Sequence, residues 1–379
     1  MTSSFSQVPF VDLAAQNQPL QTGIARAIES VIERGDFILG RDLADFETEF
    51  ARACGVEYAV GVASGTAAIA IGLQARGIGP GDEVLVPANT FVATAIGVIQ
   101  AGATPVFVDC HLDTALIDLD AAERAISPRT KAIVPVHLYG QMVSPGRLQD
   151  LARSRDLLIF EDAAQAHGAV RENARAGSIG SAAAFSFYPS KNLGAFGNGG
   201  ILVSDDPEIA RKARSLRNYG APSKYYHVDI GTNSRLDTLQ AAILRVKLPY
   251  LPAWNRERHR IARLYDRLLA PLADKGIVPV RDETETGHVY HLYVIRVLAD
   301  CRVDRRQLQE ELANSGVQTG IHYPLPCHLQ PGYHYLGYRA GDFPNAELLS
   351  EQILSLPMYP GLTEEQVHFV SERVTSIIG

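Results

Sequence analysis

The sequence of 379 residues lacks any segment that would send it into or across a membrane. No run approaches the roughly 18 apolar residues of a spanning helix, and the N-terminal stretch MTSSFSQVPFVDL has no basic region followed by an apolar one. Basic blocks are also missing, since 35 Lys and Arg are interspersed with 42 Asp and Glu, for a formal net charge of −7. We therefore expect a cytoplasmic protein that acts on small molecules, with no membrane and no nucleic acid as partner.

Metal-binding and nucleotide-binding signatures are missing as well. The four cysteines are scattered without a CxxC pair, and the eleven histidines include no HExxH motif. His322, His328 and His334 lie close together in the sequence, but on a segment rich in Pro and Tyr without metal-ligand spacing. No GxGxxG motif follows an early strand, which argues against a Rossmann domain. We expect no metal, and structural roles for Cys54, Cys110, Cys301 and Cys327.

The part of the chain between about residues 55 and 205 shows the pattern of an α/β fold. Short β-branched or apolar runs alternate there with helical patterns, and two further runs follow one another without a helix between them. Such alternation is typical of a mostly parallel sheet that is covered on both faces. We predict a seven-stranded mixed sheet with strands at 58–62, 82–87, 104–109, 131–137, 157–162, 182–187 and 199–204.

A second, smaller α+β domain is expected at the C-terminal end. Pro249 and Pro252 interrupt a helical pattern, so we place the boundary there, with an N-terminal arm and the large domain in 1–250 and the small domain in 251–379. The first 20 residues are expected to be an arm that lies against the body or a partner. The other expected elements are helices at 207–217, 234–247, 254–269, 304–315, 345–355 and 363–378, and strands at 288–297 and 317–322.

Two local patterns could bind parts of a small anionic molecule. In ASGTAAIAIGL, Ser64, Gly65 and Thr66 follow a strand and open an apolar helix, where backbone N–H groups suit a phosphate, although a simple helix cap is an alternative. In FEDAAQAHGA, Glu161 and Asp162 end a buried strand, at the edge where open α/β sheets bind ligands. Buried carboxylates need a cation or donors nearby, and an ordinary capping turn is again the alternative.

Lys191 lies in FSFYPSKNLGAFGNGG, just beyond another expected strand. An amine held among apolar and glycine residues has a lowered pKa, which makes it nucleophilic enough for a Schiff base. A lysine whose stem packs while its head reaches solvent is the alternative. Phe91, in NTFVAT, could stack on a flat cofactor or lie in the core. Together, the phosphate seat, the strand-end Asp162 and Lys191 are what a pyridoxal phosphate enzyme needs.

At this point the sequence resembles the nucleotide-sugar aminotransferases related to DegT, DnrJ, EryC and StrS. The resemblance implies the aspartate aminotransferase fold, fold type I of the pyridoxal phosphate enzymes. It covers nearly the whole chain, and the matching segments occur in the family's order. These segments are FVDL (10–13), ASGTAA (63–68), PANTFVAT (87–94), PVHLYGQ (135–141), EDAAQAHG (161–168), SFYPSKNLGAFGNGG (186–200), NSRLDTLQAAILRVKL (233–248) and GIHYPLPCHLQ (320–330).

Roles for the ring-binding residues follow from this resemblance. It implies that Lys191 forms the internal aldimine with pyridoxal 5'-phosphate and then moves the proton on the way to pyridoxamine 5'-phosphate. Asp162 would keep the pyridine nitrogen protonated, Gln165 would bond the ring hydroxyl and Phe91 would stack on the ring. A dehydratase of the same family is disfavoured, because that branch has histidine in place of the lysine.

The resemblance also implies a phosphate site that two chains share. Gly65, Thr66 and Ser186 would hold the phosphate, and Asn233 would reach it from the second subunit of a homodimer. The one visible departure is Asn198, where many relatives carry an acid before the paired glycines.

On the substrate side, the resemblance implies contacts to a sugar nucleotide from Tyr188, Lys224 and Tyr226, with His322 and Tyr323 facing the hexose. The segment NSRLDTLQAAILRVKL resembles the corresponding segment of the branch that acts on dTDP-linked 3-keto-6-deoxyhexoses. The resemblance implies L-glutamate as amino donor and 2-oxoglutarate as its product. A 4-keto sugar aminotransferase, a UDP-3-keto-uronic acid aminotransferase and an inactive sugar-nucleotide-binding or regulatory homologue are the alternatives.

Overall fold

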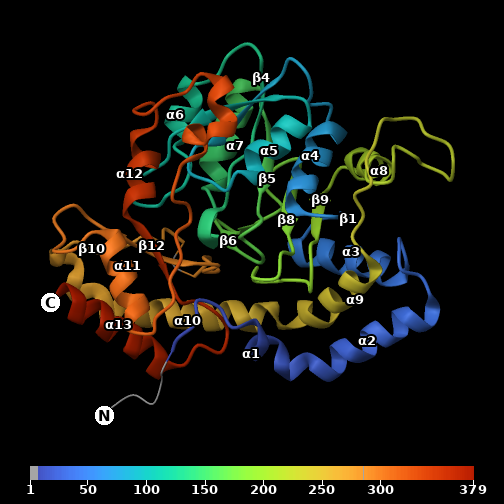
Figure 1. The fold of residues 1–379 in the computed structure, drawn as a ribbon. Helices are drawn as coiled ribbons and strands as arrows, with labels where there is room; N and C mark the ends of the chain where they lie inside the picture. Colours follow the sequence, from blue (N-terminus) through green and yellow to red (C-terminus); the bar gives the residue numbers. More distant parts are fainter. Residues whose placement is uncertain (1–6, 285) are drawn as a thin grey trace.

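The centre of the computed structural model, which describes residues 7–284 and 286–379, is a seven-stranded sheet (Figure 1). Its strands are β1 (Tyr58–Val62), β2 (Glu83–Pro87), β3 (Thr104–Val108), β4 (Thr130–Ile133), β5 (Leu158–Asp162), β8 (Ala182–Ser186) and β9 (Gly200–Ser204). Their order is β1-β9-β8-β5-β4-β2-β3, with β8, β5, β4, β2 and β3 parallel and β9 antiparallel to both of its neighbours. The mixed sheet that the sequence predicts is confirmed.

Helices pack closely on this sheet because small residues let them approach. Helix α4 (Gly65–Ala75) lies against β5, β8 and β9, and a Cβ on its Gly72 would come within 2.3 Å of the Phe160 ring and 2.7 Å of Leu202. A side chain at this position would push the helix away from the strands that form the ligand-binding edge. The helices of this part are α1 (Leu13–Asn17), α2 (Gln21–Arg34), α3 (Arg41–Cys54), α4 (Gly65–Ala75), α5 (Ala93–Gln100), α6 (Leu119–Arg124), α7 (Pro145–Arg155), α8 (Pro207–Leu216) and α9 (Thr238–Lys247).

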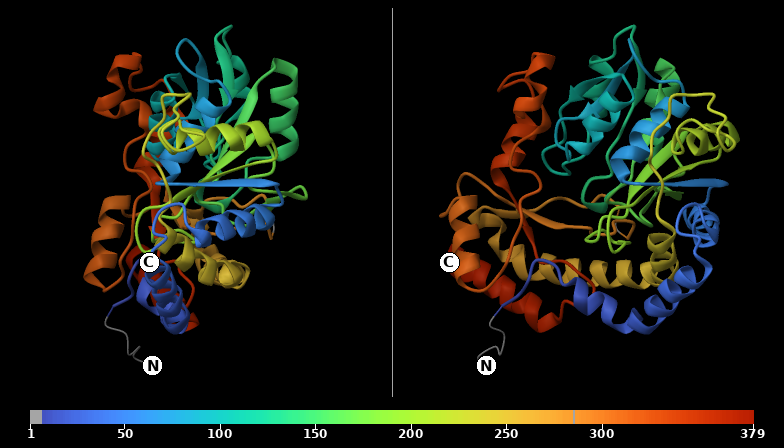
Figure 2. Two further views of the ribbon diagram at one scale, coloured as in Figure 1. Left: turned by 90° about the vertical axis from the view of Figure 1, so that its right-hand side faces the viewer. Right: turned by 45° about the vertical axis from the view of Figure 1, so that its right-hand side comes forward.

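The C-terminal part has its own antiparallel sheet and apolar core. Strands β10 (Ile277–Pro279), β11 (Tyr293–Val297) and β12 (Ile353–Leu356) pair in that order beside α10 (Leu251–Leu269), α11 (Arg305–Asn314), α12 (Pro344–Gln352) and α13 (Glu364–Ile378). Val8 is fully buried in this core and forms a parallel bridge to Val317, so the N-terminal segment packs on the C-terminal part. Figures 1 and 2 show the N- and C-terminal segments on the same side of the molecule.

Shorter elements complete the described chain. A small hairpin consists of β6 (Val170–Arg171) and β7 (Ala174–Arg175). The 3-10 helices are η1 (Gln18–Leu20), η2 (Leu138–Gly140), η3 (Leu248–Tyr250), η4 (Ala270–Lys275), η5 (Cys327–Leu329) and η6 (Pro331–Leu336). No helix within the described residues is long and apolar enough to cross a membrane.

Several predicted elements in the C-terminal part are wrong. Residues 317–322 form only isolated bridges, such as the one from Gly320 to Ser355, and the strand expected at 288–297 is limited to β11. The helix expected at 345–355 ends at Gln352, because the next four residues pair with β11 as β12. This pairing joins segments more than fifty residues apart, and a local helical pattern cannot reveal it.

The N-terminal helices and the start of the long helix also differ from the prediction. Part of the expected arm folds as α1 and η1, and residues 1–6 of that arm lie outside the described residues. Helices α2 and α3 were not predicted, and α9 begins four residues later than expected. Helix α10 already begins at Leu251, since Pro252 in the first turn needs no hydrogen-bond partner.

We propose that the domain boundary lies near residue 250, as the sequence suggests. The three-stranded sheet and its core follow this point, but the first turns of α10 still pack on the N-terminal part through Leu251 and Trp254. The long helix therefore spans both parts.

Candidate functional site

A cavity of about 440 Å³ lies where β5 and β8 end and α4 begins. It brings together residues that are far apart in the sequence, because parallel strands present their carboxyl ends at the same edge of the sheet. Among the residues that the sequence singles out, those lining the cavity are Ser64, Gly65, Thr66, Phe91, Asp162, Gln165, Ser186, Tyr188, Lys191, Asn198, His322 and Tyr323.

The start of α4 forms one end of this cavity and is suited to a phosphate. Ser64 caps the helix by accepting a hydrogen bond from the N–H of Ala67 at 3.1 Å, which leaves the N-terminal end of the helix dipole facing the cavity at Gly65 and Thr66. A Cβ on Gly65 would lie 2.9 Å from the Cβ of Ser186, so only glycine lets the end of β8 approach this closely. Backbone N–H groups and the hydroxyls of Thr66 and Ser186 therefore converge as an anion cradle.

Asp162, the last residue of β5, carries a buried carboxylate that is 5% exposed. Burial raises its pKa, while hydrogen bonds donated by the Thr94 hydroxyl at 2.7 Å and the Ala164 N–H at 3.1 Å oppose this effect. The nearby positive charge of Lys191 also favours the ionised form. The site thus holds an oriented carboxylate that can accept a hydrogen bond from a protonated nitrogen of a ligand.

Lys191 reaches the same cavity from the loop between β8 and β9. Burial lowers the pKa of its amine to about 8, although the Asp162 carboxylate partly opposes this shift. The ammonium makes no hydrogen bond to any other described residue. A lysine of this kind loses its proton far more readily than a solvated one, which makes it available as a nucleophile and as a proton carrier.

Gln165, Tyr323 and Phe91 build a wall of the cavity. The side-chain oxygen of Gln165 accepts a hydrogen bond from the N–H of Tyr139 at 2.6 Å, and its amide nitrogen donates one to the Tyr323 hydroxyl at 3.1 Å. One N–H of this amide remains for a ligand. The ring of Phe91 is 52% exposed and lies 5.3 Å from the Tyr323 ring, so it can cover a flat molecule.

Glu161, the second strand-end carboxylate of the sequence pattern, has a structural task. It is fully buried and accepts hydrogen bonds from the backbone N–H groups of Gly177 and Ile179. His137 accepts the N–H of Val143 at its Nδ1 atom, so we assign the proton to Nε2, which donates to Glu161 at 2.9 Å. The two adjacent acids thus differ in role, since Glu161 ties loops together while Asp162 faces the cavity.

Sequence reasoning missed residues that join the site from remote segments. His291 lines the cavity, and its ring forms a hydrogen bond of 3.2 Å with Asn192, the residue after Lys191. Thr94 has a local signal in PANTFVAT, but its partner Asp162 could not be identified from the pattern.

His322, which the sequence did predict, forms a 2.9 Å hydrogen bond with Ser355. Burial lowers its pKa to about 4, so its ring is uncharged near neutral pH.

Three of the predicted residues are not brought into the cavity of their own chain. Lys224, Tyr226 and Asn233 lie on the loop between α8 and α9, which projects from the molecule (Figure 1). Tyr226 is 64% exposed, and Asn233 accepts a hydrogen bond from Arg235 at 2.7 Å. Asn198, by contrast, lines the cavity.

The chain is similar to known proteins over nearly its whole length. Residues 19–375 match the DegT/DnrJ/EryC1/StrS aminotransferase family. The chain is 45% identical over 369 residues to the dTDP-3-amino-3,4,6-trideoxy-alpha-D-glucose transaminase of Streptomyces venezuelae, covering 97% of this chain and 95% of that one. It is 43% identical over 367 residues to a pleiotropic regulatory protein of Geobacillus stearothermophilus, covering 97% of each. The crystal structure of S. venezuelae DesV in complex with a ketimine intermediate superposes with a TM-score of 0.94 at 44% identity, covering 99% of both chains.

Proposed function

Because the chain belongs to the DegT/DnrJ/EryC1/StrS aminotransferase family, whose members depend on pyridoxal phosphate, we propose that it aminates a nucleotide-linked keto sugar. The reaction would transfer the amino group of L-glutamate to C3 of a 3-keto-6-deoxyhexose carried by dTDP. The observation that supports this most strongly is the approach of Lys191, with its lowered pKa, to the buried Asp162 beside the start of α4.

The residues present in the cavity fit pyridoxal phosphate. The glycine at position 65 lets Ser186 approach the helix start, and the Lys191 amine, which has no hydrogen-bond partner among the described residues, faces the same space as the Asp162 carboxylate. Gly65, Thr66 and Ser186 would hold the phosphate. When bound, the cofactor supplies a carbonyl that exchanges amino groups and a ring that withdraws electrons.

Each side chain of the cavity has a separate task in this proposal. Asp162 would hold a proton on the ring nitrogen, which its buried, hydrogen-bonded carboxylate is oriented to do. The remaining amide N–H of Gln165 would bond the ring hydroxyl, and Phe91 would cover a face of the ring. Lys191 would bind the cofactor covalently and, once released by the amino donor, move a proton between the carbons of substrate and cofactor.

We propose that a second copy of the chain completes each site. Lys224, Tyr226 and Asn233 lie outside the cavity of their own chain, on an exposed loop that can extend toward a neighbour. Asn233 would then reach the cofactor phosphate and Lys224 the diphosphate of the sugar nucleotide. A homodimer in the cytoplasm is therefore part of the proposal.

The cavity favours a neutral sugar over a uronic acid. Tyr188, His322 and Tyr323 offer polar contacts for hydroxyl groups, and the described lining residues of this chain contain no arginine and no lysine other than Lys191. A uronate carboxylate would need such a cation. Because the Asn198 amide is neutral, this position adds no negative charge beside the substrate.

A panel of amino sugars run in the reverse direction tests the substrate assignment. The cofactor-loaded enzyme is incubated with 2-oxoglutarate and either dTDP-3-amino, dTDP-4-amino or UDP-linked 3-amino sugars, and glutamate formation is measured. We expect turnover of the dTDP-3-amino sugars. Turnover of the 4-amino sugars alone would instead identify a 4-keto aminotransferase, and preference for a UDP-3-amino uronic acid would replace the dTDP assignment.

A non-catalytic regulatory role is the second candidate, because one relative carries the name of a regulatory protein. The cavity keeps the lysine, the aspartate and the phosphate cradle that the chemistry requires. A protein that only binds sugar nucleotides would not need an amine with a lowered pKa at this place, so the aminotransferase proposal is preferred.

A further inference from the structure

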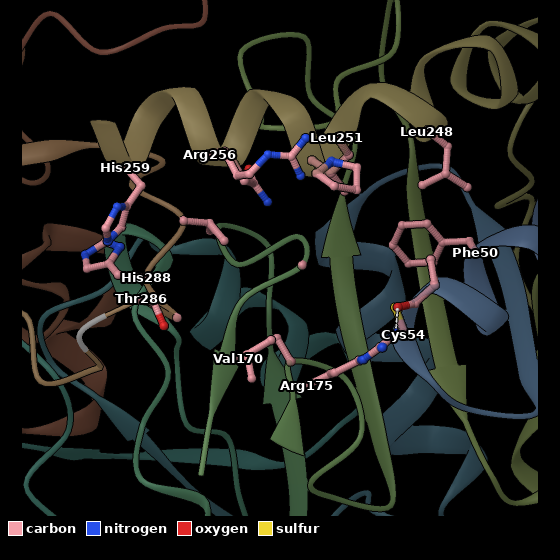
Figure 3. Close-up of a pocket in the computed structure, with 17 residues that line it drawn as sticks. Phe50, Cys54, Val170, Arg175, Leu248, Leu251, Arg256, His259, Thr286 and His288 are labelled. Carbon is pink, nitrogen blue, oxygen red and sulfur yellow. Dashed lines mark hydrogen bonds between the residues drawn. The ribbon is translucent and has the colours of Figure 1, made fainter. Parts of the chain in front are cut away.

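A second cavity, of about 590 Å³, lies between α10, the end of α3 and the β6–β7 hairpin (Figure 3). Its walls include the buried apolar side chains of Phe50, Leu251 and Val289, which are 2%, 6% and 4% exposed. This volume is within the range of small-molecule pockets, and the apolar walls suit a ring of one or two cycles.

Two arginines give this cavity a positive character. Arg256 extends from α10 and Arg175 from the hairpin toward Cys54 (Figure 3), and both are exposed. Arg175 donates a hydrogen bond to the carbonyl oxygen of Ala53 at 2.9 Å, whereas Arg256 has no hydrogen bond or ion pair with another described residue. The described residues that line the cavity include no carboxylate.

Histidines line the far end of the cavity. His288 lies there beside His259 and Thr286 (Figure 3), and burial lowers the pKa of His288 to about 4. Its ring is therefore neutral near neutral pH, whereas the guanidinium groups of Arg256 and Arg175 are positively charged. Guanidinium groups match the planar oxygens of carboxylates and phosphates.

We propose that this cavity binds a small organic anion, with an apolar ring against Phe50 and Leu251 and its anionic group at Arg256 and Arg175. The occupant is a different molecule from the cofactor and the sugar nucleotide, because its site is separate from the cavity that holds Lys191. It acts as an effector of the enzyme.

Hydrogen bonds connect the wall of this cavity to the lysine loop. The side chain of Asn255, which lines the cavity, accepts a hydrogen bond from Asn192 at 3.0 Å and donates one to the carbonyl oxygen of His167 at 2.8 Å. Asn192 also donates to the carbonyl oxygen of Val289 at 2.9 Å. Since Asn192 directly follows Lys191, an occupant that shifts Asn255 or Val289 changes the surroundings of the lysine.

Binding is tested by calorimetry on the cofactor-loaded enzyme with 2-naphthoate and with its neutral analogue 2-naphthamide. We expect 2-naphthoate to bind once per chain, and R256Q and R175Q each to weaken it about tenfold, as loss of a charge-assisted hydrogen bond does. Arg267 is exposed on the same helix outside the cavity, so R267Q is the matched control and should bind like the wild type. The affinity of 2-naphthamide should not depend on any of these substitutions.

Absence of 2-naphthoate binding would overturn the proposal. Equal affinities of R256Q, R175Q and the wild type would also overturn it, because the anion would then be bound elsewhere, for example in the catalytic cavity. A loss of affinity in R267Q as large as in R256Q would show a general charge effect and would equally count against the site. Cofactor content and thermal unfolding of each variant verify that it is folded.

The connection to Lys191 has its own readout, which is the pH titration of the visible absorbance of the bound cofactor. Coupling between sites in proteins is typically about fivefold or more, so saturating 2-naphthoate should shift the titration midpoint by about 0.7 pH unit. N255A should abolish this shift, because it removes the connection to Asn192. An unchanged midpoint in the wild type would overturn the connection to the lysine.

Discussion

The ammonium of Lys247 donates a hydrogen bond to the carbonyl oxygen of Gly194, three residues beyond Lys191. Lys247 is 1% exposed, its Nζ atom lies 5.3 Å from the centre of the Phe196 ring, and burial lowers its pKa to about 8. Gln240, also on α9, accepts a hydrogen bond from the N–H of Phe196 at 2.8 Å. Helix α9 therefore holds the loop that carries Lys191, so a residue outside the cavity positions the lysine.

We expect Lys247→Met to disturb this loop without preventing folding. The substitution keeps the buried stem but leaves the Gly194 carbonyl unpaired, which should lower the free energy of unfolding by about 1 to 3 kcal/mol. The kcat should decrease, and the KM for the keto sugar should change less than the kcat does. Lys131→Met, at an exposed position of β4, is the control. A variant with wild-type kcat and unfolding free energy would show that Lys247 does not position the loop.

Replacement of Lys191 should abolish amino transfer. Lys191→Ala removes the nucleophile and proton carrier, and Lys191→Arg keeps the positive charge but cannot exchange with the cofactor carbonyl, so both should lose at least about 10³-fold in kcat. Circular dichroism should show both variants folded. Turnover that survived in Lys191→Ala would exclude the aminotransferase mechanism proposed above.

The uptake of cofactor by cofactor-free protein should depend on pH with a midpoint near 8. Burial lowers the pKa of Lys191 to about 8, and only the unprotonated amine has the lone pair that attacks a carbonyl, so the rate should rise through this pH and then level off. Stopped-flow absorbance measures the rate. A rate that still rises tenfold per unit above about pH 9 would instead indicate a lysine with an ordinary pKa.

Thr94→Val should shift the acidic limb of the pH profile of kcat/KM to higher pH. The Thr94 hydroxyl stabilises the ionised Asp162 carboxylate, and burial already raises the pKa of this acid. Loss of the hydroxyl should raise the pKa further, because the ionised carboxylate then accepts one hydrogen bond fewer. Thr94→Ser keeps the donor and should restore the wild-type profile. Identical acidic limbs in all three proteins would mean that the ionisation of Asp162 does not limit the reaction.

Mixing two inactive variants tests whether two chains share each site. If Asn233 serves the neighbouring chain, a dimer of Lys191→Ala with Asn233→Ala contains one site with both residues intact. Activity should therefore reappear when the two proteins are unfolded, mixed and refolded together. Refolding each variant alone is the control. A mixture no more active than Asn233→Ala by itself would show that this residue acts within its own chain or not at all.

The large sheet and the centre of the site could be predicted from the sequence. Strands β2 and β9 are mostly apolar and buried along their whole length, as expected of strands in a sheet that is covered on both faces. Asp162 and Ser186 end such strands and Gly65 opens the helix after another, so the parallel arrangement brings them to one edge. Lys191 lies in the loop that leaves β8 at this edge, so its place in the cavity could be predicted from the sequence pattern.

Features that depend on contacts between remote segments could not be predicted from the sequence. The four residues of β12 form a strand only because β11 lies beside them, and nothing local distinguishes them from the end of α12. Asn192 is tied to Asn255 and His291, about 60 and 100 residues away, by contacts that exist only after both parts have packed. A local sequence pattern predicts the burial and the backbone conformation of its own segment. The hydrogen bonds around Lys191 join side chains from remote segments, which come within bonding distance only in the folded chain.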